Sequence, residues 1–420
     1  MRDATGVPPS AGAAAPSIAA RRARVAVGLL FFANGIALTT VLPRLPEIKA
    51  DLSLTNTALG LALAAAPVGS LTAVPVTGRL IARFGSAPVA AVAGLVLGLA
   101  LPMLGLAPAW AALAGTYLLL GAADGVMDAA MNAHGLRVQK RYGRSLINGM
   151  HGLWSLGAAT GAAIGTLSAA LRVPLELHLV AVAAIVLVAA GAATAWRLRG
   201  PDPADLNDPT DGPVEDPGAG TAPKPGGVWR AVRPLAWVGL LGVLAGIPED
   251  VANAWSTLYL AEGRGAPPGL AGLGYTTFAA AMLLSRFSAD TVTDRFGTVT
   301  VARVGGLLAF AGYVVVLTSP VVWLSIAGFA LVGVGIAPAF PTLFHASGHW
   351  PGVRSGDGVT VLSWVARLGF LVTPPLVGLI ADRAGIGTGL WVGAAAALAY
   401  AMLAGRLAPA VKPPTRTRAP

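Results

Sequence analysis

Long, continuous apolar segments separated by short polar turns dominate the chain. Each segment has about 18 residues or more, and a helix of that length crosses about 30 Å of hydrocarbon. A membrane-spanning strand would instead show about ten residues of alternating pattern. The pattern therefore predicts an all-α membrane protein. It has twelve transmembrane helices, at 24–43, 57–78, 86–107, 110–136, 146–171, 176–197, 234–260, 269–290, 298–318, 321–345, 357–380 and 386–406.

Composition supports this fold class, since 55% of the residues are hydrophobic and only 11% are charged. The 54 glycines suit helices that pack closely in lipid through small residues. Prolines inside the segments are expected to kink or break helices where neighbouring helices or a cavity satisfy the freed backbone groups. These prolines are Pro67, Pro75, Pro248, Pro338, Pro341, Pro374 and Pro375.

The hydrophobicity collapses between Arg199 and Arg233 into a stretch rich in Pro, Gly and Asp, which is typical of a solvated linker. Six predicted helices precede it and six follow it. The expected organisation is a disordered cytoplasmic tail (1–20), an N-terminal six-helix bundle (21–198), a cytoplasmic linker (199–233), a C-terminal six-helix bundle (234–408) and a second cytoplasmic tail (409–420).

The net charge of +10 at first suggests a nucleic-acid partner, but its distribution argues against one. With the N-terminus in the cytoplasm, only five of the 29 Lys and Arg residues fall on the opposite side, and Arg367 lies inside a helix. This asymmetry follows the positive-inside rule for a multi-pass protein with both termini in the cytoplasm. We therefore expect the cytoplasmic (inner) membrane, with membrane lipids and no nucleic acid as partners.

Several chemistries are excluded by missing residues or motifs. There is no cysteine, which rules out disulfides and thiolate metal sites. There is no glycine-rich phosphate loop, so ATP does not drive the protein directly. No nucleophile motif of a hydrolase occurs either. We expect no enzyme activity, no cofactor and no metal.

The two halves carry traces of a repeat. At an offset of 212 residues, Phe84-Gly85 aligns with Phe296-Gly297, and seven positions between Phe84 and Ala100 are identical to their counterparts. Such an internal repeat of six helices is typical of secondary transporters.

Twelve helices in two halves, a central linker and an Arg-Phe-Gly turn after helices 2 and 8 resemble the major facilitator superfamily. Its loop signature, Gly-x-Leu-x-Asp-Arg-x-Gly, is similar to "GRLIARFG" (78–85), where Ala82 replaces the acid, and to "ADTVTDRFG" (289–297), which keeps it. The resemblance implies that these loops gate the cytoplasmic side. Because the first loop lacks the acid, whether it latches as the second loop does is an open question. The loop residues are Gly78, Arg83, Gly85, Asp290, Asp294, Arg295 and Gly297.

Within the superfamily, "DAAMNAHGLRV", "MHGLWSLGAATGAAIG", "ANAWSTLYL" and "GFLVTPPLVGLIADRAG" resemble the sugar-permease-like inner-membrane carriers of bacteria. The substrates of that subgroup are largely unassigned. The resemblance therefore implies a carrier and leaves its solute undefined.

A polar column stands out in the fourth helix, where Asp124, Asp128 and Asn132 are four residues apart and share one face. An ionisable residue at mid-membrane costs about 2.5–3.5 kcal/mol, so this face needs a polar partner or a wet cavity. The column either holds helices together or serves function. The equivalent positions of helix 10 are apolar (Ile336, Phe340 and Phe344), so the scaffold does not require polar groups there.

His151 begins the fifth helix at a depth close to that of Asp128 across the intervening hairpin. Two carboxylates and an imidazole in a poorly solvated site are suited to proton uptake and release near physiological pH. The alternative for His151 is a satisfied structural hydrogen bond.

Helix 7 carries Glu249 and Asn253 one turn apart just after Pro248. An acid beside a proline-broken helix resembles the discontinuous helices that hold ligands in transporters. Nearby Trp255 either stacks on a ligand ring or anchors the helix at the membrane interface.

Arg367 lies about ten residues into helix 11 and needs an anion. Its partner is an acid across the cavity or an anionic substrate group, and the alternative is a side chain that reaches back to the surface. Asn34, midway along helix 1, is a further candidate that also suits plain helix packing.

Together these features predict a secondary transporter that acts as a monomer and moves a small solute by alternating access, with proton or ion coupling. Sugar or metabolite uptake is favoured by the subgroup. Export of a drug or secondary metabolite by proton antiport is the main alternative, and a transporter-like sensor is a remote one.

Overall fold

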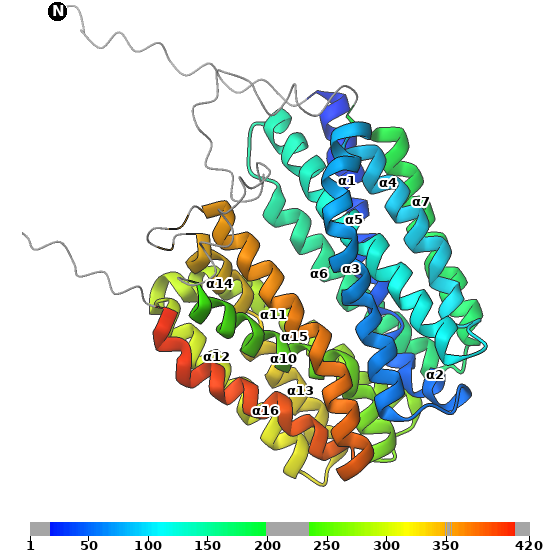
Figure 1. The fold of residues 1–420 in the computed structure, drawn as a ribbon, viewed down its shortest axis with the longest axis vertical. Coiled ribbons are helices and arrows are strands. Elements are labelled where there is room, and N and C mark those ends of the chain that lie inside the picture. Colours follow the sequence, from blue (N-terminus) through cyan, green and yellow to red (C-terminus); the bar gives the residue numbers. More distant parts are fainter. Residues whose placement is uncertain (1–16, 199–234, 349, 351–352, 354, 408–420) are drawn as a thin grey trace, which may run out of the picture.

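A computed structural model describes residues 17–198, 235–348, 350, 353 and 355–407. The expected linker and most of both expected tails lie outside these residues, so the predicted domain boundaries stay predictions. Within the described residues the chain folds into two bundles of helices that lie side by side (Figure 1). The all-α fold class is confirmed.

The first bundle contains the first six predicted spans. Its elements are α1 (Ile18–Thr39), the short turn η1 (Leu42–Arg44), α2 (Leu45–Asp51), α3 (Asn56–Phe84), α4 (Ser86–Ala100), η2 (Leu101–Leu104), α5 (Trp110–Tyr142), α6 (Ile147–Ala170) and α7 (Leu175–Trp196).

The second bundle contains the other six spans, the tenth of which is divided between α13 and α14. Its elements are α10 (Ala236–Leu258), η3 (Tyr259–Gly263), α11 (Pro268–Phe296), α12 (Thr298–Thr318), α13 (Val322–Ile336), α14 (Ala339–Gly348), α15 (Ser355–Ala384), α16 (Ile386–Leu403) and η4 (Ala404–Leu407).

The prolines act differently from one helix to another. Helix α3 runs through Pro67 and Pro75, α10 runs through Pro248, and α15 runs through Pro374 and Pro375. Only the tenth span breaks, between Ile336 and Ala339, where Pro338 cannot donate a backbone hydrogen bond. The predicted helix break is thus found at Pro338, whereas the helices continue through the other prolines named here.

The same tight turn closes three helices. Gly85, Gly297 and Gly385 follow α3, α11 and α15 with φ of 84°, 79° and 88° and ψ near 150°. This backbone region is essentially open to glycine alone. The Arg-Phe-Gly motif, which occurs twice in the sequence, therefore marks a turn that is repeated in the structure. The same backbone turn occurs a third time after α15.

Ten segments of the described chain are long and apolar enough to cross a membrane. The two helices that fall short are α10 and α11. In α10 the mean hydropathy is lowered by Glu249, Asp250 and Asn253, which lie together in its second half. The outward faces of the bundles are apolar, as shown by exposed Phe287 (74%) and Leu99 (66%), which suits contact with lipid.

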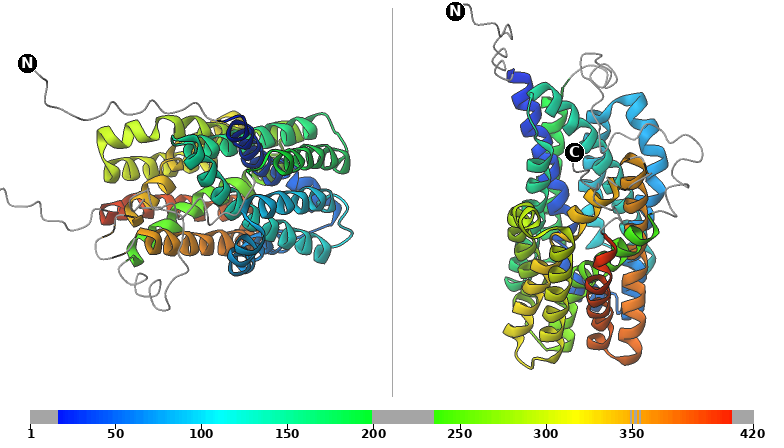
Figure 2. Two further views of the ribbon diagram at one scale, coloured as in Figure 1. Left: turned by 90° about the horizontal axis from the view of Figure 1, so that it is seen from above. Right: turned by 90° about the vertical axis from the view of Figure 1, so that its left-hand side faces the viewer.

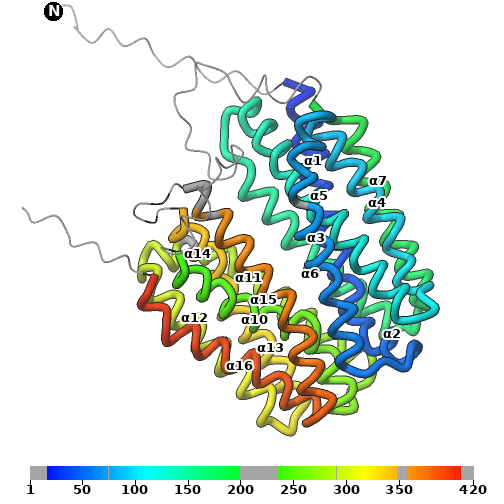
Figure 3. The backbone as a smooth tube through the Cα atoms, in the orientation of Figure 1, coloured from blue at the N-terminus to red at the C-terminus, as the bar shows by residue number. Residues whose placement is uncertain are grey.

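The bundles meet at one end and separate toward the other. We call the end that carries Ile18 and Leu407 the terminal end and the opposite one the distal end. The tube in Figure 3 follows α3 and α15 together to the distal end, and the ribbons diverge toward the terminal end. The two further views show the helices of each bundle running roughly alongside one another (Figure 2).

Polar contacts between the bundles hold the distal end closed. Asp382 at the end of α15 accepts hydrogen bonds from the backbone N–H groups of Asn56 and Thr57, both 2.8 Å long. These groups belong to the first turn of α3, so a carboxylate of one bundle caps a helix of the other. An ion pair of 2.6 Å between Lys49 Nζ and Glu262 Oε2 adds a second link.

Close backbone approaches complete this seam. A Cβ atom added at Gly60, Gly378 or Gly272 would clash with Pro374, Asn56 and Thr166 of the opposite bundle, respectively. Glycine is therefore required where α3 crosses α15 and where α6 crosses α11. The Thr166 and Thr276 hydroxyls also lie 2.8 Å apart across the second crossing.

The first prediction tests the distal seam. A Cβ atom at Gly269 would lie 2.6 Å from that of Ala170, and a disulfide holds Cβ atoms about 3.8 Å apart. In the cysteine-free chain, Ala170→Cys with Gly269→Cys should therefore cross-link on oxidation after a small shift. The double variant should then lose reaction with maleimide-PEG in SDS and regain it after reduction, with each single variant as control. Thiols that stay free after oxidation would contradict the closed distal end.

The second prediction ranks the two polar links by thermal unfolding in detergent. Asp382→Ala leaves two backbone N–H groups without acceptors and should lower the free energy of unfolding by about 1 kcal/mol. Lys49→Ala removes a partly exposed ion pair and should cost about 0.5 kcal/mol. A larger loss in Lys49→Ala would mean that the ion pair, and not the helix cap, carries the closure.

Candidate functional site

A cavity of about 440 Å³ lies between the two bundles. Helices α1, α3, α5 and α6 line it from the first bundle, and α10, α11 and α15 line it from the second. Its charged lining residues are Asp124, Glu249, Asp250, Arg286 and Arg367. The cavity thus gathers acids from both bundles and arginines from the second.

Asp124 is held by a chain of hydrogen bonds that joins three helices. The amide of Asn34 donates to Asp124 Oδ1 at 2.7 Å, and the indole N–H of Trp154 donates to Asn34 Oδ1 at 2.8 Å. Asn34 is only 4% exposed, while Asp124 and Trp154 line the cavity. Asn34 therefore orients the carboxylate and the indole from behind the cavity wall.

Asp128 and Asn132 form the next two steps of the column but do not line the cavity. The amide of Asn132 donates to Asp128 Oδ1 at 3.0 Å and to the Asp128 carbonyl at 2.9 Å. The column therefore divides into Asp124, bonded to α1, and an Asp128–Asn132 pair satisfied within α5.

His151 is exposed and also lies outside the cavity wall. Its ring packs edge-on against Phe31 with centroids 5.1 Å apart, and it interacts electrostatically with Asp128. The structure thus brings His151 and Asp128 into the same neighbourhood without a hydrogen bond between them.

Arg367 joins the two bundles electrostatically. It lines the cavity from α15 and interacts with both Asp124 and Asp128 of α5. Its side chain makes no hydrogen bond or ion pair with the described residues. The guanidinium is therefore close to two carboxylates yet has donors available for a ligand.

On the second bundle, Glu249 and Asn253 line the cavity, whereas Trp255 does not. Trp255 is completely buried in the core, and its indole N–H has no hydrogen-bond partner. In this conformation the Trp255 ring is enclosed by the protein, and its role in ligand binding or anchoring stays a prediction. The indole available to a ligand is Trp154.

Several cavity residues were absent from the candidates drawn from the sequence, among them Trp154 and the three that follow. Asp250 directly follows Glu249, and a second acid in an apolar helix was the available signal. Arg286 has a possible partner four residues away at Asp290, whose side chain lies outside the described residues, yet it lines the cavity and donates to Ser155 Oγ of α6 at 3.1 Å. Tyr117 gave no signal, because a tyrosine in an apolar helix is unremarkable in sequence.

Several polar atoms at the cavity are left without partners among the described residues. These atoms are Tyr117 OH, Glu249 Oε2 and Asp250 Oδ2. Buried polar groups are normally hydrogen-bonded, so each of these atoms calls for water or a ligand. They supply acceptors beside the donors of Arg367.

The positions in helix α14 that correspond to the polar column are packed by aromatic rings. Phe340 stacks on Phe370 of the cavity wall with centroids 6.1 Å apart, and Phe344 follows at 6.3 Å from Phe340. The asymmetry seen in the sequence therefore appears in space as hydrogen-bonded polar groups on α5 and packed aromatic rings on α14.

The expected gating loops lie at the terminal end and are largely exposed. Arg83 packs over the ring of Phe84 and Arg295 over that of Phe296, at 5.3 and 5.4 Å. Among the described residues, the hydrogen bonds between the bundles lie at the distal end or at the Ser155–Arg286 contact. The described side chains of these loops make no latch between the bundles. The side chain of Asp290 lies outside the described residues. A gating role therefore stays a prediction for all seven loop residues, Gly78, Arg83, Gly85, Asp290, Asp294, Arg295 and Gly297.

Two helical bundles around a polar cavity closed at one end define the class of membrane transporters. The model of the Major Facilitator Superfamily matches residues 27–248 and 238–420, so the chain belongs to this family. The predicted twelve-helix membrane fold is thereby confirmed, and the chain is a multi-pass membrane transporter rather than an enzyme.

Known proteins agree with this placement. An uncharacterized MFS-type transporter of Yersinia pestis is 33% identical over 364 residues, which are 86% of this chain and 89% of the relative. The crystal structure of the nucleoside transporter NupG matches with a TM-score of 0.73 and 13% identity over 93% of this chain and 98% of its own. The D-xylose-proton symporter matches with a TM-score of 0.70 and 14% identity over 93% and 98%.

The third prediction concerns the support of Asp124. Asn34→Ala removes a buried amide that serves both Asp124 and Trp154, and should lower the free energy of unfolding in detergent by about 1–3 kcal/mol. Asn132→Ala is the matched control, since its amide serves only its own helix. An Asn34→Ala variant that unfolds like the wild type would mean that this chain of hydrogen bonds is not stabilising.

Proposed function

We propose that the chain is a proton-coupled secondary transporter that moves a small polar solute across the cytoplasmic membrane by alternating access. The observation that carries the proposal is the cavity that Arg367 of one bundle and Asp124 of the other both line, with Arg367 also interacting electrostatically with Asp128. The transporter acts as a monomer, with its exposed apolar faces in lipid.

The orientation follows from the distribution of basic residues. Because most Lys and Arg residues lie on the side of the termini, that side faces the cytoplasm. The terminal end is then the inner end and the distal end the outer one. The conformation described above is accordingly closed to the outside.

Alternating access requires the distal contacts to break while the terminal end closes. The links between the bundles suit such a cycle, because they are a helix cap, an ion pair and glycine crossings, which form and break without covalent change. The exposed gating loops are available to meet once the bundles rock.

Proton coupling has a physical basis in the charges across the cavity. With both carboxylates ionised, Asp124 and Asp128 together attract Arg367 and hold the two bundles toward each other. A proton on either acid weakens that attraction and frees the guanidinium for a substrate oxygen. Protonation, substrate binding and the relative position of the bundles are thereby linked.

The solute we favour is a sugar or nucleoside taken up by the cell. The cavity offers carboxylate and hydroxyl acceptors, arginine donors and the Trp154 indole, which match a polyhydroxylated ring. The names of the solved nucleoside transporter and D-xylose-proton symporter point to the same kind of solute.

The fourth prediction tests coupling in proteoliposomes with a panel of radiolabelled pentoses, hexoses and nucleosides. The wild type should accumulate at least one solute under an inward proton gradient and lose accumulation when a protonophore is added. Asp128→Asn should abolish accumulation while keeping exchange of the same solute, because the site remains but the proton carrier is gone. Accumulation should survive in Glu176→Gln, the control for an exposed acid.

Two results would overturn the coupling proposal. One is uptake that does not respond to the imposed pH gradient. The other is an Asp128→Asn variant that accumulates solute as well as the wild type.

A further inference from the structure

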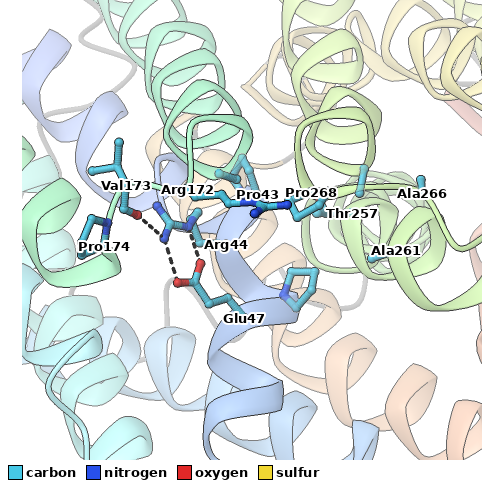
Figure 4. Close-up of a pocket in the computed structure, with 13 residues that line it drawn as sticks. Pro43, Arg44, Glu47, Arg172, Val173, Pro174, Thr257, Ala261, Ala266 and Pro268 are labelled. Atoms are coloured by element: carbon cyan, nitrogen blue, oxygen red, sulfur yellow. Dashed lines mark hydrogen bonds and ion pairs between the residues drawn. The ribbon is translucent and has the colours of Figure 1, made fainter.

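A second pocket of about 380 Å³ lies at the distal end and shares no lining residue with the central cavity. Both bundles form its walls (Figure 4). The first contributes Pro43, Arg44, Glu47, Arg172 and Val173. The second contributes Thr257, Ala261, Ala266 and Pro268. Nothing in the transport mechanism proposed above uses this pocket.

One of its two arginines is a fixed part of the wall. Arg44 is 2% exposed and donates to both carboxylate oxygens of Glu47, at 2.6 and 2.8 Å, and to the Val173 carbonyl at 2.8 Å. Its guanidinium also lies 3.5 Å from His178 Nδ1. Three of the five donors of Arg44 are thus bonded to protein oxygens, and the charge of Glu47 is neutralised.

Arg172 is different, because its backbone is strained and its side chain is free. It follows the end of α6 with φ of 54°, and its N–H bonds the Ala169 carbonyl while that of Val173 bonds the Ser168 carbonyl. This is the position of a helix C-terminal motif that glycine normally occupies. An arginine here costs more than glycine, and such outliers cluster at functional sites.

The side chain of Arg172 has no partner of its own. Figure 4 shows it running across the pocket toward Thr257 and Pro268 of the other bundle. It makes no hydrogen bond or ion pair with the described residues. Arg172 is exposed to solvent, and a guanidinium without a protein partner at a pocket wall can exchange water for a carboxylate or phosphate.

Thr257 supplies an independent observation from the opposite wall. It is 1% exposed, and its hydroxyl has no hydrogen-bond partner, although a helical threonine can usually bond the carbonyl one turn back. Thr257 lines the same pocket as Arg172, although its hydroxyl oxygen is itself buried. After a rotation of the Thr257 side chain toward the pocket, a ligand oxygen between the two residues would satisfy both.

We propose that this pocket binds a small organic monocarboxylate, held by Arg172 of one bundle and by the Thr257 hydroxyl of the other. With Arg44 and Glu47 cancelling each other, the pocket carries one net positive charge, which fits a monoanion better than a dianion. The remaining walls are proline, alanine and Val173, which fit a short apolar tail.

Binding here has a consequence for transport that rests on the proposed function. The pocket exists only while the two bundles meet at the distal end, so an occupant favours this closed state over the outward-open one. A carboxylate outside the cell would therefore slow the cycle from a site away from the substrate.

The test uses the purified full-length protein in detergent, with sodium propionate as the probe and sodium chloride at equal ionic strength as reference. Propionate should raise the thermal midpoint of the wild type in a saturable manner. Arg172→Gly should abolish that rise while having a midpoint of its own equal to or above that of the wild type, since glycine relieves the left-handed backbone. Thr257→Val should weaken the apparent affinity about 3- to 10-fold, as expected for one lost hydrogen bond.

Arg367→Gln separates this pocket from the central cavity, because it should keep the full propionate response. In the Ala170→Cys, Gly269→Cys background, propionate should also speed cross-linking, and addition of Arg172→Gly should remove the acceleration. Neither measurement involves transport, so a negative result in either would not contradict the proposed transport function. A negative uptake assay would likewise not contradict binding at the distal pocket.

Four results would overturn the proposal. They are an absent or unsaturable propionate response in the wild type, an equal response in Arg172→Gly, loss of the response in Arg367→Gln, or unchanged cross-linking. A further experiment compares the protein in nanodiscs of phosphatidylglycerol and of phosphatidylcholine. Stabilisation by phosphatidylglycerol that needs Arg172, without any effect of propionate, would assign the anion to a lipid headgroup and overturn the soluble carboxylate.

Discussion

A carboxylate or guanidinium within the hydrocarbon layer is stable only when it is turned away from lipid, toward water or an opposite charge. Every feature of the central site follows from that constraint. Asp124 on α5 and Arg367 on α15 both line the cavity, and Asp128 lies close enough to interact electrostatically with Arg367. The apolar outer faces and the polar inner faces of the two bundles both follow from this requirement. The inner charges also couple the bundles, because charges on one bundle attract those on the other.

In the proposed cycle the same two bundles must also separate at the distal end. The contacts there hold the bundles together and can still break. Contact at the distal end comes from glycine crossings and from Asp382 capping α3, each of which contributes little by itself. Close packing without interlocked large side chains lets helices slide or rock. A seam built from many weak links is stable as a whole, yet a modest change in charge or ligand at the cavity can open it.

The cavity and the distal pocket depend on the seam in opposite ways. In the proposed cycle the cavity persists as the bundles rock and changes only the side to which it opens, whereas the distal pocket is divided when its walls part. Arg172 and Thr257 come from different bundles, so a ligand that needs both can occupy only one state. The strained backbone of Arg172 is consistent with a side chain retained for a contact rather than for folding.

The sequence by itself determined the helical membrane fold, the two halves, the repeat turn at Gly85 and Gly297, and the polar column, because these follow from hydropathy, periodicity and residue chemistry read locally. Only the tertiary structure decided which polar residues meet. It divided the column, placing Asp124 in the cavity and pairing Asp128 with Asn132. It buried Trp255 and brought Arg286 and Ser155 together from 131 positions apart. The physical reason is that the register and rotation of each helix are set by packing against neighbours distant in sequence, and no local pattern encodes that packing.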